Sequence, residues 1–154
     1  MEPQIERCTV DQAPVLTEIA HAAKRHWGYP ERYIEAWSES LTVGPEMVRH
    51  HQVWACRVGE EVAGFYVLMR SGYRMELEHL WVRPDFIGKG IGRYLMHHAV
   101  RLAREAGVHM IDITSDPNAE GFYRRIGARR VGEVYAPVDG TSRHLPRLAL
   151  EVGT

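Results

Sequence analysis

The sequence predicts an α+β domain in which helices pack against a β-sheet. Some segments alternate apolar and polar residues with the period of two typical of strands, and others carry apolar residues at helical spacing. Along the 154 residues the two types follow the order β-α-α-β-β-β-α-β-α-β-β. This length corresponds to about one domain, so we expect residues 1–154 to form a single unit with one core.

The first third of the chain is predicted to be a strand followed by helices. Asp11 is expected to be the N-cap of the first helix, with Pro14 in its first turn. The segment 27–30, which contains a glycine and a proline, separates this helix from the next one. The predicted elements are a strand at 5–10, helices at 11–25 and 31–41, and a short helical turn at 45–50.

The clearest helix of the remainder is predicted over residues 90–106, because an apolar stripe runs along it and Gly107 ends it. Pro146 is expected at the start of a strand or in an edge strand, where its missing N–H does no harm. The other predicted elements are strands at 52–58, 62–70, 75–82, 110–114, 130–135 and 145–152, and a short helix at 118–126.

Composition narrows the classes of function. The formal net charge of −1 favours neither a nucleic-acid nor a membrane partner. No apolar run approaches the roughly 18 residues that a membrane span needs. The N-terminus has no signal-peptide pattern, and with only two cysteines we expect a cytoplasmic protein without disulfides. The nine histidines do not follow a metal-ligand spacing, so no metal site is expected.

A glycine-rich loop is the most informative segment. Residues 80–93 read as a strand end, a proline, and then Gly88, Gly90 and Gly92 at the start of the predicted helix. A helix N-terminus presents unpaired amides to an anion, and glycines let a ligand approach them closely. The spacing fits neither the Walker A loop nor the dinucleotide fingerprint. Without further signals, a tight turn that serves packing is an equally good interpretation.

Two motifs together resemble the GNAT superfamily of N-acetyltransferases. Gly90 and Gly92 match the two glycines of its motif A, and Leu80, Val82 and Pro84 match the strand end before it. One departure is that Ile87 stands where the family usually has Gln or Arg, so backbone amides are expected to hold the phosphates.

Residues 116–128 resemble the family's motif B, in which an Asn is followed by Phe-Tyr and a glycine. Asn118, Phe122, Tyr123 and Gly127 provide these, whereas Ala128 replaces the usual aromatic residue. The resemblance covers the whole chain in element order.

This resemblance implies a mixed, mostly antiparallel sheet between helices, in α/β/α layers, with fourth and fifth strands that splay apart around acetyl-CoA. It implies that Leu80 and Val82 pair with the pantetheine arm, that amides of residues 87–92 hold the pyrophosphate, and that Asn118 contacts the arm. Lys89 and Arg93 are favoured over Arg124 and Arg125 as charged partners of the phosphates. The full set of expected cofactor contacts is Leu80, Trp81, Val82, Ile87, Gly88, Lys89, Gly90, Ile91, Gly92, Arg93, Asn118, Phe122 and Tyr123.

Acetyl transfer to an amine needs a base and a proton donor for the leaving thiolate. Glu76 and Glu78 both lie on the predicted strand 75–82, and strand alternation places them on the same face as Leu80 and Val82. Glu76 matches the catalytic glutamate of the histone-acetylating branch, so Glu76 or Glu78 is the expected base; a solvated rim is the alternative for both. Tyr123 matches the family tyrosine near the sulfur and is the expected acid.

The acceptor is expected near the first two helices, as in the family. Trp27, Tyr29, Tyr33 and Trp37 are candidates for its pocket, with core packing as the alternative. The sequence leaves open whether the acceptor is a small-molecule amine or an amine of a protein or peptide. A homodimer is one possible assembly. A second functional class also remains open, a non-catalytic acyl-CoA sensor, although such a protein need not keep Glu76 and Tyr123.

Overall fold

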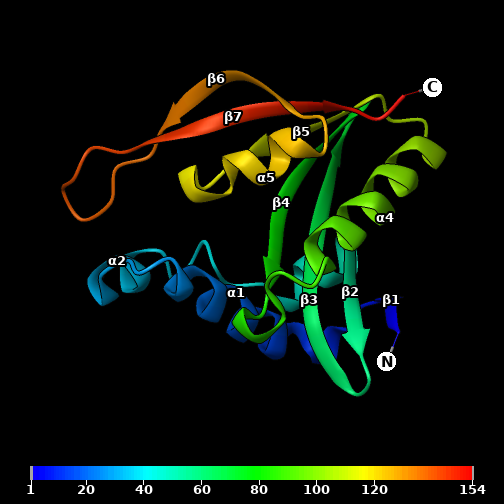
Figure 1. The fold of residues 1–154 in the computed structure, drawn as a ribbon, viewed down its shortest axis with the longest axis horizontal. Coiled ribbons are helices and arrows are strands. Elements are labelled where there is room, and N and C mark those ends of the chain that lie inside the picture. Colours follow the sequence, from blue (N-terminus) through cyan, green and yellow to red (C-terminus); the bar gives the residue numbers. More distant parts are fainter. Residues whose placement is uncertain (1, 154) are drawn as a thin grey trace.

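The computed structural model describes residues 2–153, whose strands form one sheet in the order β1-β2-β3-β4-β5-β7-β6 (Figure 1). Neighbouring strands are antiparallel except β4 and β5, which are parallel. The predicted mixed, mostly antiparallel sheet is therefore confirmed. The strands are β1 Pro3–Arg7, β2 Gln52–Val58, β3 Glu61–Ser71, β4 Arg74–Val82, β5 Met110–Thr114, β6 Arg129–Tyr135 and β7 His144–Glu151.

Helices cover both faces of the sheet and bury two separate apolar clusters. The first cluster includes Leu95 of α4 and Tyr123 of α5, and the second includes Leu16 of α1 and Val48 of α3. The predicted α/β/α layering is thus confirmed, with the helices close to their expected positions. The α-helices are α1 Ala13–His26, α2 Glu31–Ala36, α3 Pro45–His50, α4 Ile91–Glu105 and α5 Glu120–Arg125; short 3-10 turns are η1 Val10–Gln12, η2 Pro84–Phe86 and η3 Pro117–Ala119.

Strands β4 and β5 separate after four residue pairs. They are paired from Arg74 with Met110 to Leu77 with Ile113, and residues 78–82 of β4 have no partner on β5. Figure 1 shows the two strands diverging in the middle of the sheet. The expected splay is confirmed, and it leaves one backbone edge of β4 free inside the protein.

A β-bulge on β4 reverses the orientation predicted for Glu76. Val67 of β3 pairs with His79 and the next residue, Leu68, pairs with Leu77, so Glu78 is an extra residue on β4. Leu80 faces the first apolar cluster, whereas Met69, the partner of Glu76, packs against the second. The prediction that Glu76 shares a face with Leu80 and Val82 is therefore wrong, because the bulge shifts the alternation by one residue.

The N-terminal elements differ in detail from the prediction. The first strand ends at Arg7, and Asp11 lies inside a 3-10 turn that follows Thr9 rather than capping a helix. The Thr9 amide donates to the Gln12 side chain at 2.9 Å, and α1 starts only at Ala13. The capping interaction thus comes from a residue two positions before the expected one.

The second helix is shorter than the predicted range 31–41. It ends at Ala36, and the hydroxyl of Ser40 donates to the carbonyl of Trp37 at 2.9 Å. The same carbonyl still accepts the amide of Leu41 at 2.9 Å, so the chain continues beyond Ala36 as hydrogen-bonded turns. The turn then leads Leu41 and Val43 into the second apolar cluster.

Pro146 lies near the start of β7, as its third residue, and directly before the first residue of β7 that pairs with β5. The alternative of an edge strand is wrong, because β7 pairs with β5 on one side and β6 on the other. The carbonyl of Pro146 accepts the amide of Ser115, one residue beyond the end of β5. In an antiparallel strand the N–H and C=O of one residue point to the same side. The missing N–H therefore faces the region where β5 has already ended.

Candidate functional site

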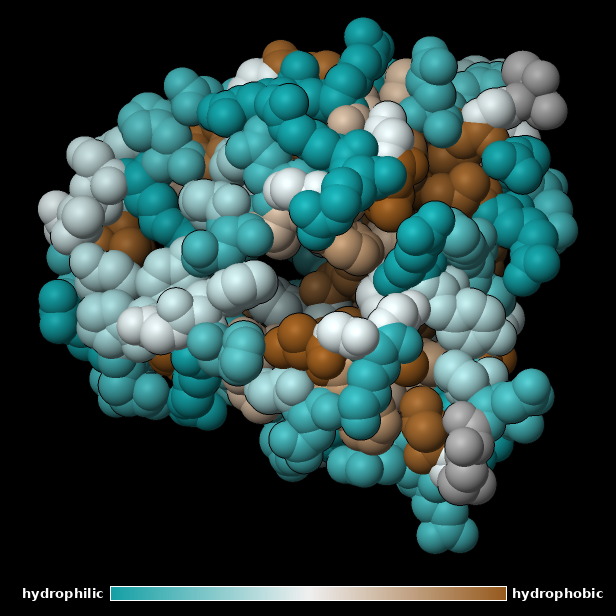
Figure 2. All heavy atoms as spheres, viewed as in Figure 1, coloured by the Kyte–Doolittle hydropathy of each residue, from teal (hydrophilic) through white to brown (hydrophobic). Residues whose placement is uncertain are grey.

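A cavity of about 590 Å³ lies where β4 and β5 separate. Its walls come from β4, the loop before α4, the first turn of α4, η3 and α5, and the C-terminal end of α1 closes one side. Figure 2 shows a hollow near the centre of the view, with hydrophobic residues around it. The splay of the two strands therefore produces the space that the candidate site needs.

The loop before α4 offers a row of free backbone amides to this cavity. The amide of Ile87 donates to Pro84 and that of Tyr94 to Gly90, whereas the amides of residues 88–93 donate to no acceptor among residues 2–153. Gly88 and Gly90 have φ values of +82° and +80°, and open space lies where a Cβ would stand. These amides lie at the N-terminus of a 15-residue helix, so the loop is suited to an anion.

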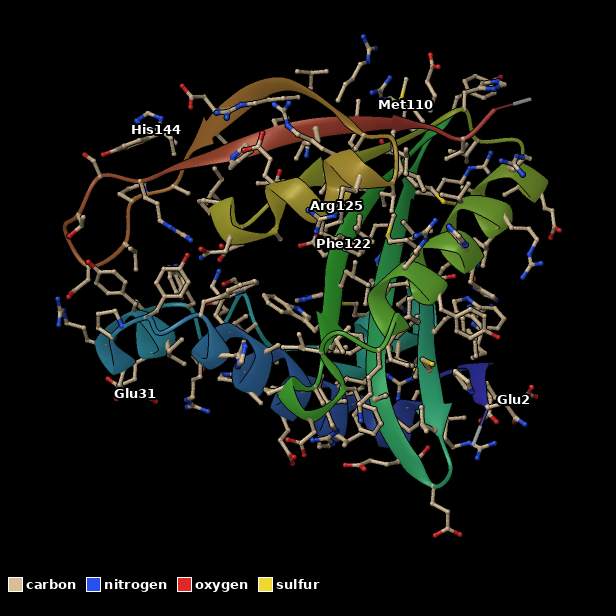
Figure 3. The ribbon with its side chains drawn as sticks, viewed as in Figure 1. Glu2, Glu31, Met110, Phe122, Arg125 and His144 are labelled. Carbon is tan, nitrogen blue, oxygen red and sulfur yellow. The ribbon has the colours of Figure 1, made fainter. Side chains whose placement is uncertain are left out.

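Twelve of the thirteen residues expected to contact the cofactor line the cavity. Lys89 is the exception, since its ammonium lies 5.3 Å from the centre of the Phe86 ring and outside the lining. Arg125, which the sequence ranked below Lys89, lines the cavity together with Arg93. Figure 3 shows Phe122 and Arg125 projecting from α5 toward β4.

The lining fits the parts of a coenzyme A molecule. The free amides of residues 88–93 and the guanidinium groups of Arg93 and Arg125 suit a pyrophosphate. The free edge of β4 at residues 78–82 offers backbone groups to the amides of an extended arm. Gly92 also allows close packing here, because a Cβ on it would lie 3.4 Å from the Phe122 ring.

Of the two candidate acids, only Glu78 lines the cavity, and its exposed carboxylate makes no ion pair with residues 2–153. Both oxygens of Glu76 are instead occupied by the guanidinium of Arg147, at 2.7 and 2.9 Å. The bulge therefore brings Glu78 into the cavity and turns Glu76 toward β7.

Tyr123 also lines the cavity, although the residue as a whole is only 7% exposed. Burial raises the pKa of the Tyr123 hydroxyl, and the negative charge of Asp116 raises it further. The hydroxyl makes no hydrogen bond with the described part of the chain. It is thus a protonated donor at neutral pH, available to a ligand in the cavity.

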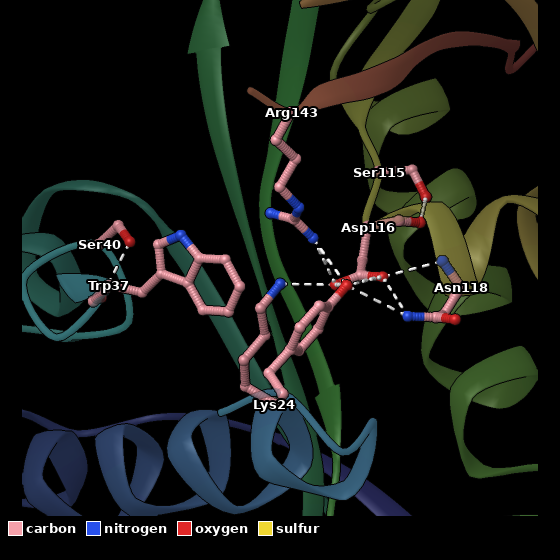
Figure 4. A network of polar contacts seen from close by, with 8 residues as sticks. Lys24, Trp37, Ser40, Ser115, Asp116, Asn118 and Arg143 are labelled. Carbon is pink, nitrogen blue, oxygen red and sulfur yellow. Dashed lines mark hydrogen bonds and ion pairs between the residues drawn. The ribbon is translucent and has the colours of Figure 1, made fainter. Parts of the chain in front are cut away.

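A polar cluster with buried charged groups lies at the edge of the cavity (Figure 4). It is formed by Lys24, Tyr29, Asp116 and Arg143, with the exposed Asn118 at its rim. The Lys24 ammonium donates to Asp116 at 2.6 Å. Arg143 donates to the Tyr29 hydroxyl at 2.7 Å and to Asp116 at 3.3 Å. Asn118, expected to contact the pantetheine arm, donates from its side chain to Tyr29 at 3.2 Å and to Asp116 at 3.0 Å.

The aromatic residues proposed for the acceptor pocket separate into two groups. Trp27 lines the cavity, whereas Tyr29, Tyr33 and Trp37 do not. The Trp37 ring packs edge-on against Tyr29 and Tyr33, with centroids 4.9 and 5.7 Å apart. Tyr29 is part of the polar cluster, and the Tyr33 and Trp37 rings lie beside it, with the Trp37 ring centroid 4.4 Å from the Lys24 ammonium.

Three further features of the described residues concern the metal site, the membrane span and the cysteines considered above. Within residues 2–153, no group of three His, Cys, Asp or Glu side chains is arranged to hold a metal ion. No helix in this part of the chain has the length and apolar character to cross a membrane. Cys8 and Cys56 are both buried and unpaired.

Replacing Gly90 with alanine is expected to weaken acetyl-CoA binding, because the Cβ enters the open space above the loop amides at a left-handed φ. The backbone cost is about 1 kcal/mol of stability. Gly72→Ala is a matched control, since Gly72 also has a positive φ of +63° and open space but lies in the β3–β4 turn, outside the cavity. Thermal shift by acetyl-CoA should fall for the first variant alone; an equal fall in both would contradict this role.

Comparisons with known proteins identify relatives of this chain among acetyltransferases. Residues 15–128 match the acetyltransferase (GNAT) family. The chain is 38% identical over 87 residues to a streptothricin acetyltransferase of Streptomyces lavendulae, covering 53% of this chain and 46% of that protein. It is 32% identical over 91 residues to the peptidyl-lysine N-acetyltransferase YjaB of Escherichia coli K12, covering 59% and 56%.

The chain thus spans about half the length of these two curated relatives. Among solved structures, the PaiA N-acetyltransferase of Thermoplasma acidophilum in complex with coenzyme A has the same fold, with a TM-score of 0.77 at 19% identity over 98% of this chain and 99% of that one. From the family match over residues 15–128 we conclude that the chain belongs to the GNAT family of acetyltransferases.

Proposed function

We propose that this chain is an N-acetyltransferase that moves an acetyl group from acetyl-CoA to a primary amine by direct attack. The observation that carries the proposal is the single cavity that brings together the free loop amides, the Glu78 carboxylate and the Tyr123 hydroxyl. Relatives named for streptothricin and for peptidyl-lysine support an amine acceptor. A cytoplasmic location and a homodimer remain predictions.

In this proposal, acetyl-CoA supplies the acetyl group as an activated thioester. The amides of residues 88–93 bind the pyrophosphate, and Arg93 and Arg125 neutralise its charge. The free edge of β4 orients the arm so that the thioester end points toward Glu78 and Tyr123. Ile87 needs to contribute no polar side chain to this arrangement, because the neighbouring amides are free.

Glu78 is the proposed base. An alkylammonium group has a pKa of about 10.4 and must lose its proton before it can attack. The Glu78 carboxylate lies on the cavity wall without a cation of the described chain to occupy it, so it is available to accept this proton directly or through a water. Glu76, held by Arg147 on the other side of the bulge, is the less favourable candidate.

Tyr123 is proposed to stabilise the leaving sulfur with a hydrogen bond. Its pKa is raised by burial, so it lies further above the roughly 8.5 of a simple thiol than that of an ordinary tyrosine. Complete proton transfer to the thiolate is therefore unfavourable. The hydroxyl keeps its proton and stabilises the developing negative charge as a fixed donor.

A two-step assay tests the proposed activity. We expect acetyl-CoA to raise the melting temperature, and we expect thiol release from it when amines are added. The panel should include small amines, lysine-containing peptides and peptides with free N-termini. A thermal shift without thiol release on any acceptor would favour the acyl-CoA sensor, and the absence of a shift would contradict acetyl-CoA binding itself.

Tyr123→Phe is expected to lower kcat by about 10- to 100-fold, the lower part of the range for losing an acid–base group, because a hydrogen bond is lost rather than a full proton transfer. The ring still fills its place in the core, so acetyl-CoA should produce the wild-type thermal shift. Steady-state thiol release measures the effect. Tyr94→Phe, at an exposed position outside the cavity, is the control and should keep wild-type kcat. Wild-type kcat in Tyr123→Phe would remove this residue from the mechanism.

A further inference from the structure

The polar cluster carries one more positive charge than negative charge. Lys24 and Arg143 are cations, and Asp116 is the one acid that forms an ion pair with either of them within residues 2–153. Their side chains are only 9%, 14% and 7% exposed. A buried charge is costly unless it is paired, so this cluster is suited to an additional anion.

Arg143 has donor groups left for such an anion. Its Nη2 donates to Tyr29 and Asp116, whereas Nε and Nη1 make no hydrogen bond with the described residues. Within residues 2–153, every fully buried side-chain nitrogen or oxygen atom has a hydrogen-bond partner. Because Nε and Nη1 of Arg143 have none, these two atoms must be accessible to solvent. The guanidinium and the Lys24 ammonium both lie against the Trp37 ring, at 4.7 and 4.4 Å from its centroid.

The position of the cluster separates this anion from the phosphates of the cofactor. Its members Asp116 and Asn118 form part of the cavity wall, and the charge of Asp116 reaches Tyr123. The pyrophosphate is assigned to the loop at residues 88–93, in a different part of the lining. An anion bound at the cluster would therefore be distinct from the pyrophosphate.

Arg143 lies on the segment between β6 and β7, outside the cavity lining but in contact with Asp116, which is part of that lining. The hydroxyl of Tyr33 on α2 donates to Thr141 at 3.3 Å, and Arg32 pairs with Asp139 at 2.9 Å. Figure 1 shows the β6–β7 connection extending toward α2. Two contacts from α2 thus fix the segment that carries Arg143.

We propose that Lys24 and Arg143, arranged around Trp37, form an anion subsite for the acceptor, and that the acceptor is an amine that also carries a carboxylate. This inference rests on the proposed N-acetyltransferase function and specifies its substrate class. The amine is placed at Glu78 and the carboxylate at the free donors of Arg143. Arg143 is a specificity-determining residue in this arrangement.

Matched acceptor pairs test the subsite. Glycine is compared with glycinamide and β-alanine with β-alaninamide, and thiol release gives kcat/KM for each at saturating acetyl-CoA. The ratio of kcat/KM for the carboxylate to kcat/KM for the carboxamide is then compared between variants. The two amines of a pair differ in basicity, but this difference is the same for every variant and cancels in the comparison. We expect Arg143→Gln to lower this ratio by about tenfold or more, mainly through KM, since a charge-assisted bond is lost.

Two further variants test whether the effect depends on the charge at this position. Arg143→Lys keeps the positive charge and should retain most of the wild-type ratio. Arg124→Gln removes a cation of α5 that lies outside the cavity lining and outside the cluster, and its ratio should stay close to wild type. An unchanged ratio in Arg143→Gln would overturn the proposal. An equal fall in Arg124→Gln would also overturn it, because the effect would then come from the overall charge of the protein.

A binding measurement makes the test independent of turnover. N-acetylglycine and N-acetyl-β-alanine, in the presence of coenzyme A, should raise the melting temperature of the wild type more than their carboxamides do, and Arg143→Gln should abolish the difference. If this difference appears but no amine releases thiol, the anion subsite stands and the proposed enzyme activity fails. If amines turn over without a carboxylate preference or protection, the subsite is wrong and the activity stands.

Discussion

Glu78→Gln is expected to lower kcat/KM by at least about 100-fold, the effect of removing a general base that acts directly on the attacking amine. Glutamine has almost the same shape but cannot accept the proton. Because Glu78 is exposed on the cavity wall and forms no ion pair within residues 2–153, the substitution should leave stability nearly unchanged. Thiol release with an excess of the best acceptor measures the effect.

Glu76→Gln is the matched control, since it makes the same chemical change two residues away on the same strand. Glu76 points to the opposite face from Leu80, and both its oxygens accept hydrogen bonds from Arg147. We expect activity close to wild type, with the same acetyl-CoA thermal shift in both variants. The reverse result, an inactive Glu76→Gln beside an active Glu78→Gln, would assign the base to Glu76.

The pH dependence gives a second criterion. If Glu78 takes the proton from the acceptor, the variant depends on amine that is already neutral in solution, whose fraction rises toward its pKa of about 10.4. The ratio of wild-type to Glu78→Gln activity should therefore become smaller as pH increases from 7 to 9. A constant ratio across this range would indicate that Glu78 acts in some other way, for example by positioning the acceptor.

Much of the fold was predictable because its signals are local. The amphipathic stripe of α4, the Pro84 turn and the glycines that open the helix lie within a few residues of one another. The element order follows from such patterns, and the resemblance to the family added the splay of β4 and β5. The cofactor side of the cavity could be predicted for the same reason, since most of its lining comes from two continuous segments of the chain.

The bulge on β4 was missed although the sequence contains a signal for it. Met75 and Leu77 are two positions apart, and so are Leu80 and Val82. Leu77 and Leu80, however, are three positions apart. All four pack against the same apolar cluster, so the alternation must skip one position between them. Reading this spacing would have placed Glu76 and Leu80 on opposite faces.

The acceptor side was not predictable, because its contacts join residues far apart in the chain. Lys24 and Asp116 are 92 residues apart, and Tyr29 and Arg143 are 114 apart. Tyr29, Tyr33 and Trp37 were candidates for the acceptor pocket, but they pack on one another and on two cations instead of lining the cavity. Pattern analysis cannot identify a buried ion pair whose partners come from separate elements.

Asp116→Ala is expected to lower the free energy of unfolding by about 3–5 kcal/mol, the cost of removing one partner of a buried ion pair. The substitution leaves Lys24 and Arg143 as neighbouring cations with little exposure and no acid between them. It also removes the acceptor that fixes the amide of Asn118 in η3, the turn before α5. Urea unfolding of the two proteins at pH 7 measures the difference, and a loss below about 1 kcal/mol would show that water or the aromatic rings already compensate the charges.

Asp116→Asn removes the charge of the side chain but keeps most of its capacity for hydrogen bonds. The stability difference between this variant and the wild type is expected to depend on pH. Burial raises the pKa of Asp116, but the Lys24 ammonium and the donors around the carboxylate lower it by more, so the pKa lies below its ordinary value. Stability from the charged carboxylate is therefore present above about pH 4, the ordinary Asp range, and is lost as pH falls through the lowered pKa of the folded state.

The asparagine variant has no such charge to lose, so the stability gap between it and the wild type should narrow below about pH 4. A gap that stays constant with pH would mean that shape and hydrogen bonding, rather than charge, hold the cluster together. Replacing both Lys24 and Asp116 by apolar residues of similar size should cost less than Asp116→Ala alone, because one cation without an acid, Arg143, then remains instead of two. The ion pair would then serve to position the groups at the cavity edge more than to stabilise the fold, as expected if Arg143 and Lys24 are placed there for an acceptor.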